Sequence, residues 1–155
     1  LTLGEALSTD WTGGTKVAFY DLLGDWSSIS VVEHIADLGA DVTYLTPVAG
    51  YAWKITRYSK TAITSRLREA GVEIRVLRAG LSFIGNEFTV EDLSTGKTEC
   101  ITVDAVIAAG NPAARTDQYE RLAVSRTGVT LVGDCLAPRS ALEAVYEGHE
   151  AGRAL

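Results

Sequence analysis

Short apolar runs and helical patterns alternate through the first half of the chain. Residues 16–21 and 41–46 are rich in β-branched and aromatic side chains and are bounded by turn residues, which predicts two buried strands. Between them, apolar residues recur at helical spacing, with N-cap candidates from Asp25 onward and a glycine stop at Gly39. The pattern therefore predicts a strand, a helix and a second strand.

The same alternation continues and then changes. Residues 58–70 have one apolar helical face, and residues 72–77 form a third apolar run, so the order is typical of a parallel sheet. From about residue 80 to residue 103 the apolar positions alternate with period two and are interrupted by two glycine-containing turns, which predicts a three-stranded antiparallel meander. Residues 104–109 return to a buried run that ends in Gly110.

The C-terminal part repeats the strand–helix pattern once, with a strand at 128–133 and a helix at 138–154. We therefore predict an α/β fold: a Rossmann-like parallel sheet with helices on both faces, plus the meander. Residues 1–15 contain three glycines and several hydroxyl residues and are interpreted as a linker with one short turn. The expected organisation is a linker over 1–15, a nucleotide-binding-like lobe over 16–110 and a C-terminal segment over 111–155.

Composition excludes several classes of protein. Among the 155 residues, 14 Lys and Arg oppose 20 Asp and Glu, and no basic run is present, which argues against nucleic acid or an anionic membrane as partner. No apolar run approaches the roughly 18 residues of a membrane span, and the first ten residues do not resemble a signal peptide. The two cysteines, Cys100 and Cys135, are too few for a disulfide scaffold or a four-thiolate metal site, so we expect a cytoplasmic protein and no metal ligands in this chain.

The chain starts at Leu1 and contains no methionine. Because a natural reading frame begins with methionine, we expect it to be a piece of a longer polypeptide. A processed start is the alternative.

The turn after the first strand is a weak candidate for binding a dinucleotide. Such a turn uses three glycines, so that the backbone approaches the pyrophosphate in front of the helix N-terminus, but only Gly24 is present here. Asp21 and Asp25 would place carboxylates beside the phosphates, and Thr46 stands where an acid would bind the ribose. Tight NAD(P)H binding is therefore doubtful, and a nucleotide-type fold used only as a scaffold is the alternative.

A stronger signal is the segment 132–139, between the last predicted strand and the last helix. Gly133 permits a sharp turn at the end of the strand, and Asp134 follows at the position where open sheets bind ligands. Its carboxylate would accept hydrogen bonds from ligand hydroxyls, close to the positive end of the next helix. The alternative is that Asp134 simply caps that helix.

The runs VAFYDLLGD, ADLGADVTYLTP, VDAVIAAGNP and VTLVGDCLAPRSALEAVYEGHEAGR resemble a known pattern. They are similar to the C-terminal region of the 2,4-dienoyl-CoA reductase and trimethylamine dehydrogenase family. The resemblance implies an upstream barrel in the same chain, which carries FMN and a 4Fe-4S iron–sulfur cluster outside the present residues. It also implies a partial FAD site in 111–155, with NAD(P)H as a further cofactor candidate.

Carried over to this chain, the resemblance places Gly133 and Asp134 beside the ribityl and pyrophosphate groups of FAD. Pro138 and Arg139 would start the helix below it, and Ala109 and Gly110 would match the turn after the returning strand. Gly24 completes the candidate cofactor-binding set, and no catalytic residue is expected in this chain.

The function implied is that of an excised region of a flavin-dependent oxidoreductase, which passes electrons among NAD(P)H, FAD, the cluster and FMN. The parent reaction would be reduction of an enoyl or dienoyl thioester or oxidation of an amine, and the piece alone would be inactive. The alternative is a non-catalytic scaffold or subunit-contact lobe that has lost its nucleotide. Self-association into a homo-oligomer stays open.

Overall fold

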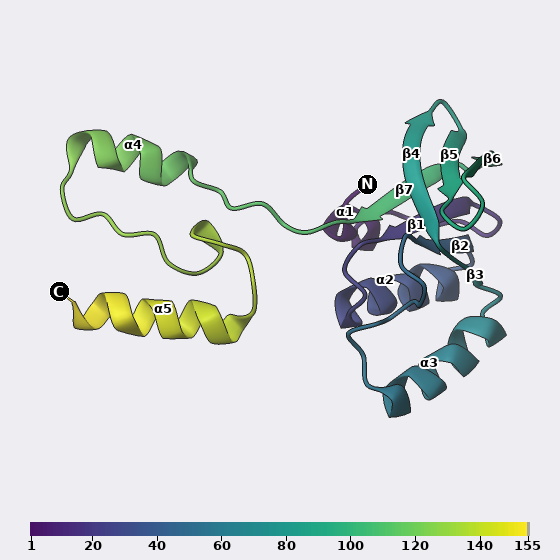
Figure 1. The fold of residues 1–155 in the computed structure, drawn as a ribbon, viewed down its shortest axis with the longest axis horizontal. Coiled ribbons are helices and arrows are strands. Elements are labelled where there is room, and N and C mark those ends of the chain that lie inside the picture. The colour runs from purple at the N-terminus through teal and green to yellow at the C-terminus, as the bar shows by residue number, and fades with distance from the viewer. Residues whose placement is uncertain (155) are drawn as a thin grey trace. The chain divides into compact units, whose positions relative to one another are not determined.

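The apolar runs of the first half form a parallel sheet in the computed structural model, which describes residues 1–154 (Figure 1). The sheet contains β1 (Lys16–Asp21), β2 (Asp41–Thr46), β3 (Glu73–Val76) and β7 (Ala105–Ala109) in the order β3-β2-β1-β7. The first two strands begin and end at the predicted residues. Because β1 is central, its carboxyl end lies between the ends of β2 and β7.

The helices α1 (Leu3–Leu7), α2 (Trp26–Asp37) and α3 (Arg57–Glu69) pack on one face of this sheet. Val17 and Phe19 of β1 point into this layer, together with Tyr44 of β2. Among the N-cap candidates that the sequence offers, Asp25 caps α2, and it accepts hydrogen bonds from the backbone N–H groups of Ser27 and Ser28.

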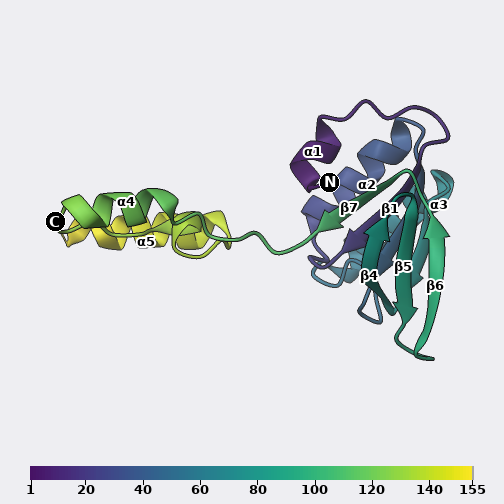
Figure 2. The ribbon, with the colours of Figure 1, turned by 90° about the horizontal axis from the view of Figure 1, so that it is seen from above.

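The other face is covered by the meander of β4 (Arg78–Ile84), β5 (Glu87–Asp92) and β6 (Lys97–Thr102), which is antiparallel in the order β4-β5-β6 (Figures 1 and 2). Ala18 and Leu45 of the parallel sheet meet Phe88 and Val90 of β5 in a second apolar cluster. The α/β class with a parallel sheet and a three-stranded meander is confirmed. The expectation of helices on both faces is not met within residues 1–110, because the apolar side of the meander occupies the second face.

Residues 1–15 differ from the linker that the sequence suggested. Thr2 caps α1 through a reciprocal pair of hydrogen bonds with Glu5, and Ala6 and Trp11 are buried in the helix-side core. The indole N–H of Trp11 donates to the carbonyl of Ala6 at 2.8 Å, and the N–H of Ala108 donates to the carbonyl of Leu1 at 2.9 Å. The segment is part of the lobe because its two buried side chains are held by the sheet and α2.

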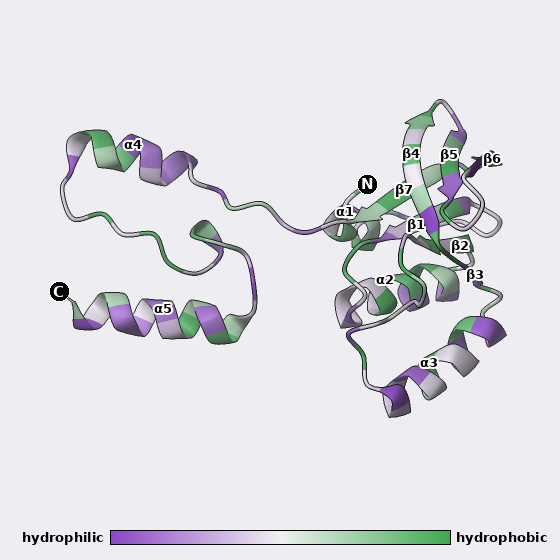
Figure 3. Ribbon diagram, viewed as in Figure 1, coloured by the Kyte–Doolittle hydropathy of each residue, from purple (hydrophilic) through white to green (hydrophobic). Residues whose placement is uncertain are grey.

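The chain divides into two compact units, Leu1–Gly110 (unit 1) and Asn111–Leu155 (unit 2), each considered by itself. Unit 2 contains α4 (Asp117–Ser125), a 3₁₀ turn at Gly133–Cys135 and α5 (Ala141–Arg153). The strand predicted at 128–133 does not form among these residues, since a strand needs a partner and unit 2 provides none. Figure 3 shows apolar positions along both helices, and Leu142 and Val145 of α5 are exposed.

None of the helices within residues 1–154 combines the length and the apolar character needed to cross a membrane.

Candidate functional site

Three of the predicted cofactor-binding residues, Gly24, Ala109 and Gly110, lie around the carboxyl end of β1. Ala109 pairs with Asp21 across the β1–β7 ladder, and the N–H of Leu22 donates to the carbonyl of Ala109 at 2.9 Å. Gly24 follows in the turn into α2 with a φ of 65°, which favours glycine. The fold thus brings these residues to the sheet edge at which open α/β sheets bind their ligands.

The carboxylate of Asp21 is fully buried and accepts hydrogen bonds from its own turn. Its Oδ1 accepts from the N–H of Leu23 at 2.9 Å, the N–H of Gly24 at 3.1 Å and the hydroxyl of Ser28 at 2.6 Å. Its Oδ2 accepts from the N–H of Gly24 at 3.1 Å and from the hydroxyl of Tyr44. A buried carboxylate is stable in such a place only because charge-assisted hydrogen bonds replace the water it has lost.

Tyr44 ties this turn to the neighbouring strand. Its ring stacks on Phe19 with centroids 5.8 Å apart and meets the ring of Tyr51 edge to face at 6.1 Å. Burial, followed by the hydrogen bond to Asp21, raises the pKa of Tyr44 well above the ordinary range for tyrosine. The phenol is therefore neutral and donates to the carboxylate at physiological pH.

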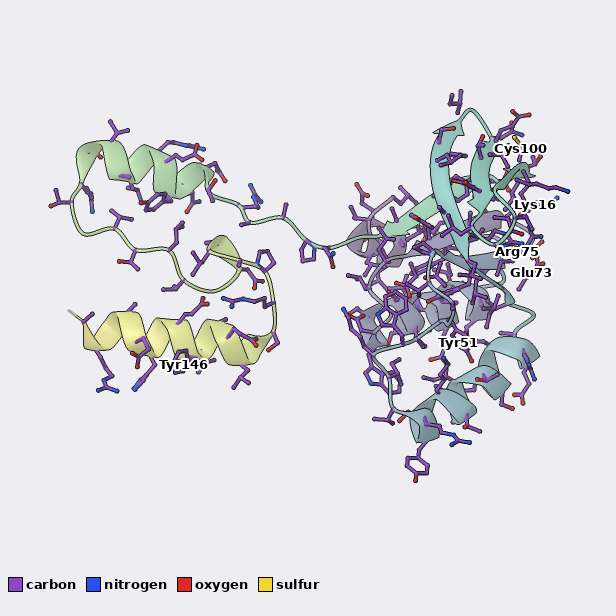
Figure 4. All side chains as sticks on the ribbon, viewed as in Figure 1. Lys16, Tyr51, Glu73, Arg75, Cys100 and Tyr146 are labelled. Carbon is purple, nitrogen blue, oxygen red and sulfur yellow. The ribbon has the colours of Figure 1, made fainter. Side chains whose placement is uncertain are left out.

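The outer side of the turn is covered by the segment that follows β2. A Cβ added to Gly24 would lie 2.2 Å from Cδ2 of Trp53, so the indole ring lies directly against this glycine. The N–H of Lys54 donates to the carbonyl of Gly24 at 2.9 Å. Tyr51, labelled in Figure 4, anchors the same segment on α3 through a hydrogen bond between its hydroxyl and that of Thr64.

The carboxyl end of β2 offers no acid at the expected ribose position. Thr46 occupies it, and its hydroxyl is buried with no hydrogen-bond partner among the described residues. A side chain buried in this way does not reach a ligand in an open crevice.

The remaining four predicted residues lie in unit 2, around the 3₁₀ turn. Gly133 is buried with a φ of 60°, and a Cβ at this position would lie 3.1 Å from the Cβ of Ala144. Its N–H donates to Oε2 of Glu147 at 2.7 Å, and the guanidinium of Arg139 pairs with the other oxygen of the same carboxylate. Glu147 on α5 therefore binds both the backbone of the Gly133 turn and the side chain of Arg139.

Asp134 is exposed, and its carboxylate accepts no hydrogen bond from residues 1–154. It does not cap the last helix: Ser140 does, through a reciprocal pair with Glu143, and α5 begins at Ala141, after Pro138 and Arg139. The hydroxyl of Ser140 lowers the pKa of Glu143 below its usual range by hydrogen bonding to the carboxylate. The capping alternative for Asp134 is thus removed, while its predicted role toward a ligand stays a prediction.

Unit 2 also has a cavity of about 410 Å³ between α4 and the extended segment 129–132. Tyr119 and Leu122 line it from the helix, and Leu131 and Cys135 from the other side. Both cysteines are free, and Cys100 lies on β6 (Figure 4).

Sequence reasoning placed Asp21 and Gly24 in this turn but missed the residues that contact them. Ser28 and Tyr44 donate hydrogen bonds to Asp21, and Trp53 lies against Gly24. These three residues come from different segments, and no local pattern links them to the turn. Glu147 was also missed, although its position three or four residues from Ala144 and Glu143 on α5 places it on the same side of the helix.

Neither a protein-family model nor a curated protein sequence matches the chain. Solved structures do. The 6-hydroxypseudooxynicotine amine oxidase from Pseudomonas geniculata N1 is similar at 27% identity and a TM-score of 0.87, over 98% of this chain and 24% of the oxidase. The histamine dehydrogenase from Rhizobium sp. 4-9 is similar at 26% identity and a TM-score of 0.88, over 99% of this chain and 26% of the dehydrogenase.

A 2-naphthoyl-CoA reductase shares the fold alone, at 20% identity and a TM-score of 0.77, over 100% of this chain and 23% of the reductase. This chain therefore spans about a quarter of the length of each of these proteins. All three are redox enzymes by name. The similarity of nearly the whole chain to the amine oxidase and to the histamine dehydrogenase confirms the resemblance that the sequence suggested.

Proposed function

Since the chain resembles the 2,4-dienoyl-CoA reductase and trimethylamine dehydrogenase family, we propose that it is the C-terminal nucleotide-binding region of a flavin-dependent oxidoreductase. The observation that carries the proposal is the match of nearly the whole chain to the amine oxidase and to the histamine dehydrogenase. In this proposal residues 16–110 form the NAD(P)-binding-like lobe, and residues 111–155 complete an FAD-binding domain whose other part precedes Leu1.

Asp134 is the residue of unit 2 best suited to hold FAD. Its carboxylate is exposed and accepts no hydrogen bond within the described chain, so it is free to accept hydrogen bonds from ligand hydroxyls. Gly133 supports it by turning the chain against Ala144, and Glu147 holds Arg139 beside the turn. FAD, when bound, would supply electron transfer. The chain's own contribution is to bind and orient it.

The proposed parent reaction takes place outside this chain, in the upstream barrel with its FMN and iron–sulfur cluster. Reduction of an enoyl or dienoyl thioester and oxidation of an amine are the two reaction classes, since the similar structures include a CoA-thioester reductase and enzymes named for amine substrates. The isolated chain is expected to have no activity.

The test is Asp134→Ala in the full-length protein. Loss of charge-assisted hydrogen bonds worth about 1.5–3 kcal/mol lowers the affinity for FAD or ADP by roughly ten- to a hundredfold. Glu150→Ala is the matched control, because Glu150 is an exposed acid of the same unit whose nearest cation is Arg153 at 3.7 Å. Adenine-nucleotide occupancy and melting temperature are measured on the same preparations.

Lower occupancy in Asp134→Ala alone, with an unchanged melting temperature of the nucleotide-free protein, supports the proposal. Unchanged occupancy in both variants contradicts the role of Asp134. A full-length protein that contains no flavin at all contradicts the proposed function and favours the scaffold alternative.

A further inference from the structure

The turn between β1 and α2 has the backbone geometry of a dinucleotide site but already contains an anion. In such folds the N–H groups of the turn and of the first helical residues point at the ligand pyrophosphate. Here the N–H groups of Leu23 and Gly24 both point at the carboxylate of Asp21, at distances of 2.9 Å and 3.1 Å. The donors that would hold a pyrophosphate are therefore in use.

We propose that Asp21 is an internal replacement for the pyrophosphate and, together with Trp53, closes unit 1 to NADH and NADPH. Asp21 is thereby a specificity-determining residue that acts by exclusion. Closure of the turn does not depend on the flavin. The consequence that NAD(P)H does not deliver electrons through this lobe rests on the proposed function.

The carboxylate is held too firmly to move aside for a ligand. Besides the turn, it accepts hydrogen bonds from the hydroxyls of Ser28 and Tyr44, and it is fully buried. A pyrophosphate that displaced it would leave a buried charge with fewer partners, which is strongly unfavourable. The N–H groups of Ser27 and Ser28 are not free either, because Asp25 accepts from both.

Trp53 closes the approach from outside. In a dinucleotide site, the absence of a side chain on glycine lets the pyrophosphate lie against the backbone. At Gly24 the same space is filled by the indole ring, with three ring atoms 2.2–2.4 Å from the position of a Cβ. The hydrogen bond from the N–H of Lys54 to the carbonyl of Gly24 holds the segment that carries Trp53 in place.

The neighbouring strand is equally unsuited to the ribose. An acid at the end of β2 would accept the ribose hydroxyls, but Thr46 is there and is fully buried. At this turn the N–H donors for the pyrophosphate are therefore occupied, and the acid for the ribose hydroxyls is replaced by a buried threonine.

The first experiment measures binding of NADH to the chain by titration calorimetry. Wild-type protein is expected to bind no tighter than about 1 mM. Low-micromolar binding by the wild type overturns the proposal. Binding of NADH to the β1–α2 turn does not depend on FAD content. Tight NADH binding would therefore overturn this proposal and leave the proposed function intact. A full-length protein without flavin would contradict the proposed function and leave the closure of the turn intact.

The second experiment opens the turn with the double variant Asp21→Gly/Trp53→Ala and uses inorganic pyrophosphate as the probe. Without the carboxylate, the N–H groups of Leu23 and Gly24 and the hydroxyls of Ser28 and Tyr44 lack their acceptor. About 10 mM pyrophosphate is expected to raise the melting temperature of this variant by about 5 °C more than that of wild type. If the variant is unfolded without the anion, the same rescue is seen as recovery of tryptophan fluorescence.

Asp37→Ala is the matched control, because it removes an exposed carboxylate from the other end of α2 without freeing any N–H group of the turn. It should respond to pyrophosphate as wild type does. Failure of pyrophosphate to rescue the double variant overturns the proposal, and so does an equal gain in Asp37→Ala, since binding would then be governed by net charge and not by occupancy of the turn.

Discussion

Replacement of Gly24 by alanine probes the contact between the β1–α2 turn and Trp53. Gly24 has a φ of 65°, a conformation that costs an L residue about 1–2 kcal/mol. The new methyl group would also lie 2.2 Å from the indole ring, so the ring or the backbone must shift. Overpacking of this kind costs about 1–3 kcal/mol, and we expect the free energy of unfolding of unit 1 to fall by about 2–5 kcal/mol in total.

Gly85 provides a matched control for the backbone part of this cost. Its φ is 63°, and a Cβ at this position would have no atom within 4 Å. Gly85→Ala should therefore lose only about 1–2 kcal/mol. In a Trp53→Ala background the clash is gone, and the additional loss from Gly24→Ala should shrink to the same size, which makes the two substitutions strongly non-additive.

Urea unfolding followed by tryptophan fluorescence is the suitable assay. The three tryptophans of the chain, Trp11, Trp26 and Trp53, all lie in unit 1, so the signal reports this unit alone. If Gly24→Ala and Gly85→Ala lose the same stability, and Trp53→Ala changes neither value, then the ring does not occupy the space over Gly24.

The remaining predictions concern Tyr44 and unit 2. The folded state raises the pKa of Tyr44. The contribution of Tyr44 to stability is therefore complete below about pH 10, where the unfolded tyrosine is also neutral. This contribution declines as pH rises from about 10 toward the higher folded pKa. Urea midpoints between pH 9 and 11 should therefore fall less in Tyr44→Phe than in wild type, and parallel curves would contradict this. In unit 2, neither α4 nor α5 has a buried residue, so their amides should exchange hydrogen much faster than those of β1 and β2 in the isolated chain; equal protection would contradict it.

The elements that the sequence predicts well are those determined by nearby residues. β1 and β2 match residue for residue, since each is a short apolar run between turn residues. The start of α2 falls at the first of the predicted N-cap candidates, because the cap at Asp25 needs only the next three residues. The candidate site residues of unit 1 gather at the sheet edge for the same reason: strand order places Ala109 beside Asp21.

The parts that sequence reasoning missed depend on contacts between distant segments. Residues 1–15 read as a glycine-rich linker, but burial of Ala6 and Trp11 outweighs the local turn preference. The period-two pattern of the meander predicted its strands. It did not predict that the meander covers one face of the parallel sheet, and helices were therefore expected on that face. The run at 128–133 has the composition of a strand, and composition cannot supply the partner that a strand requires.

Asp21 shows why the residues of a turn do not by themselves reveal what the turn does. From sequence, its carboxylate counts against a dinucleotide through repulsion, and repulsion between exposed charges is screened beyond about 8–10 Å at physiological salt. In the structure the carboxylate is buried and uses the N–H groups of Leu23 and Gly24. Hydrogen bonds formed inside the protein are not screened in this way, so closure by occupancy should persist at high ionic strength, whereas closure by repulsion alone should weaken. The response of NADH binding to salt therefore separates the two causes in the wild-type chain, with no substitution needed.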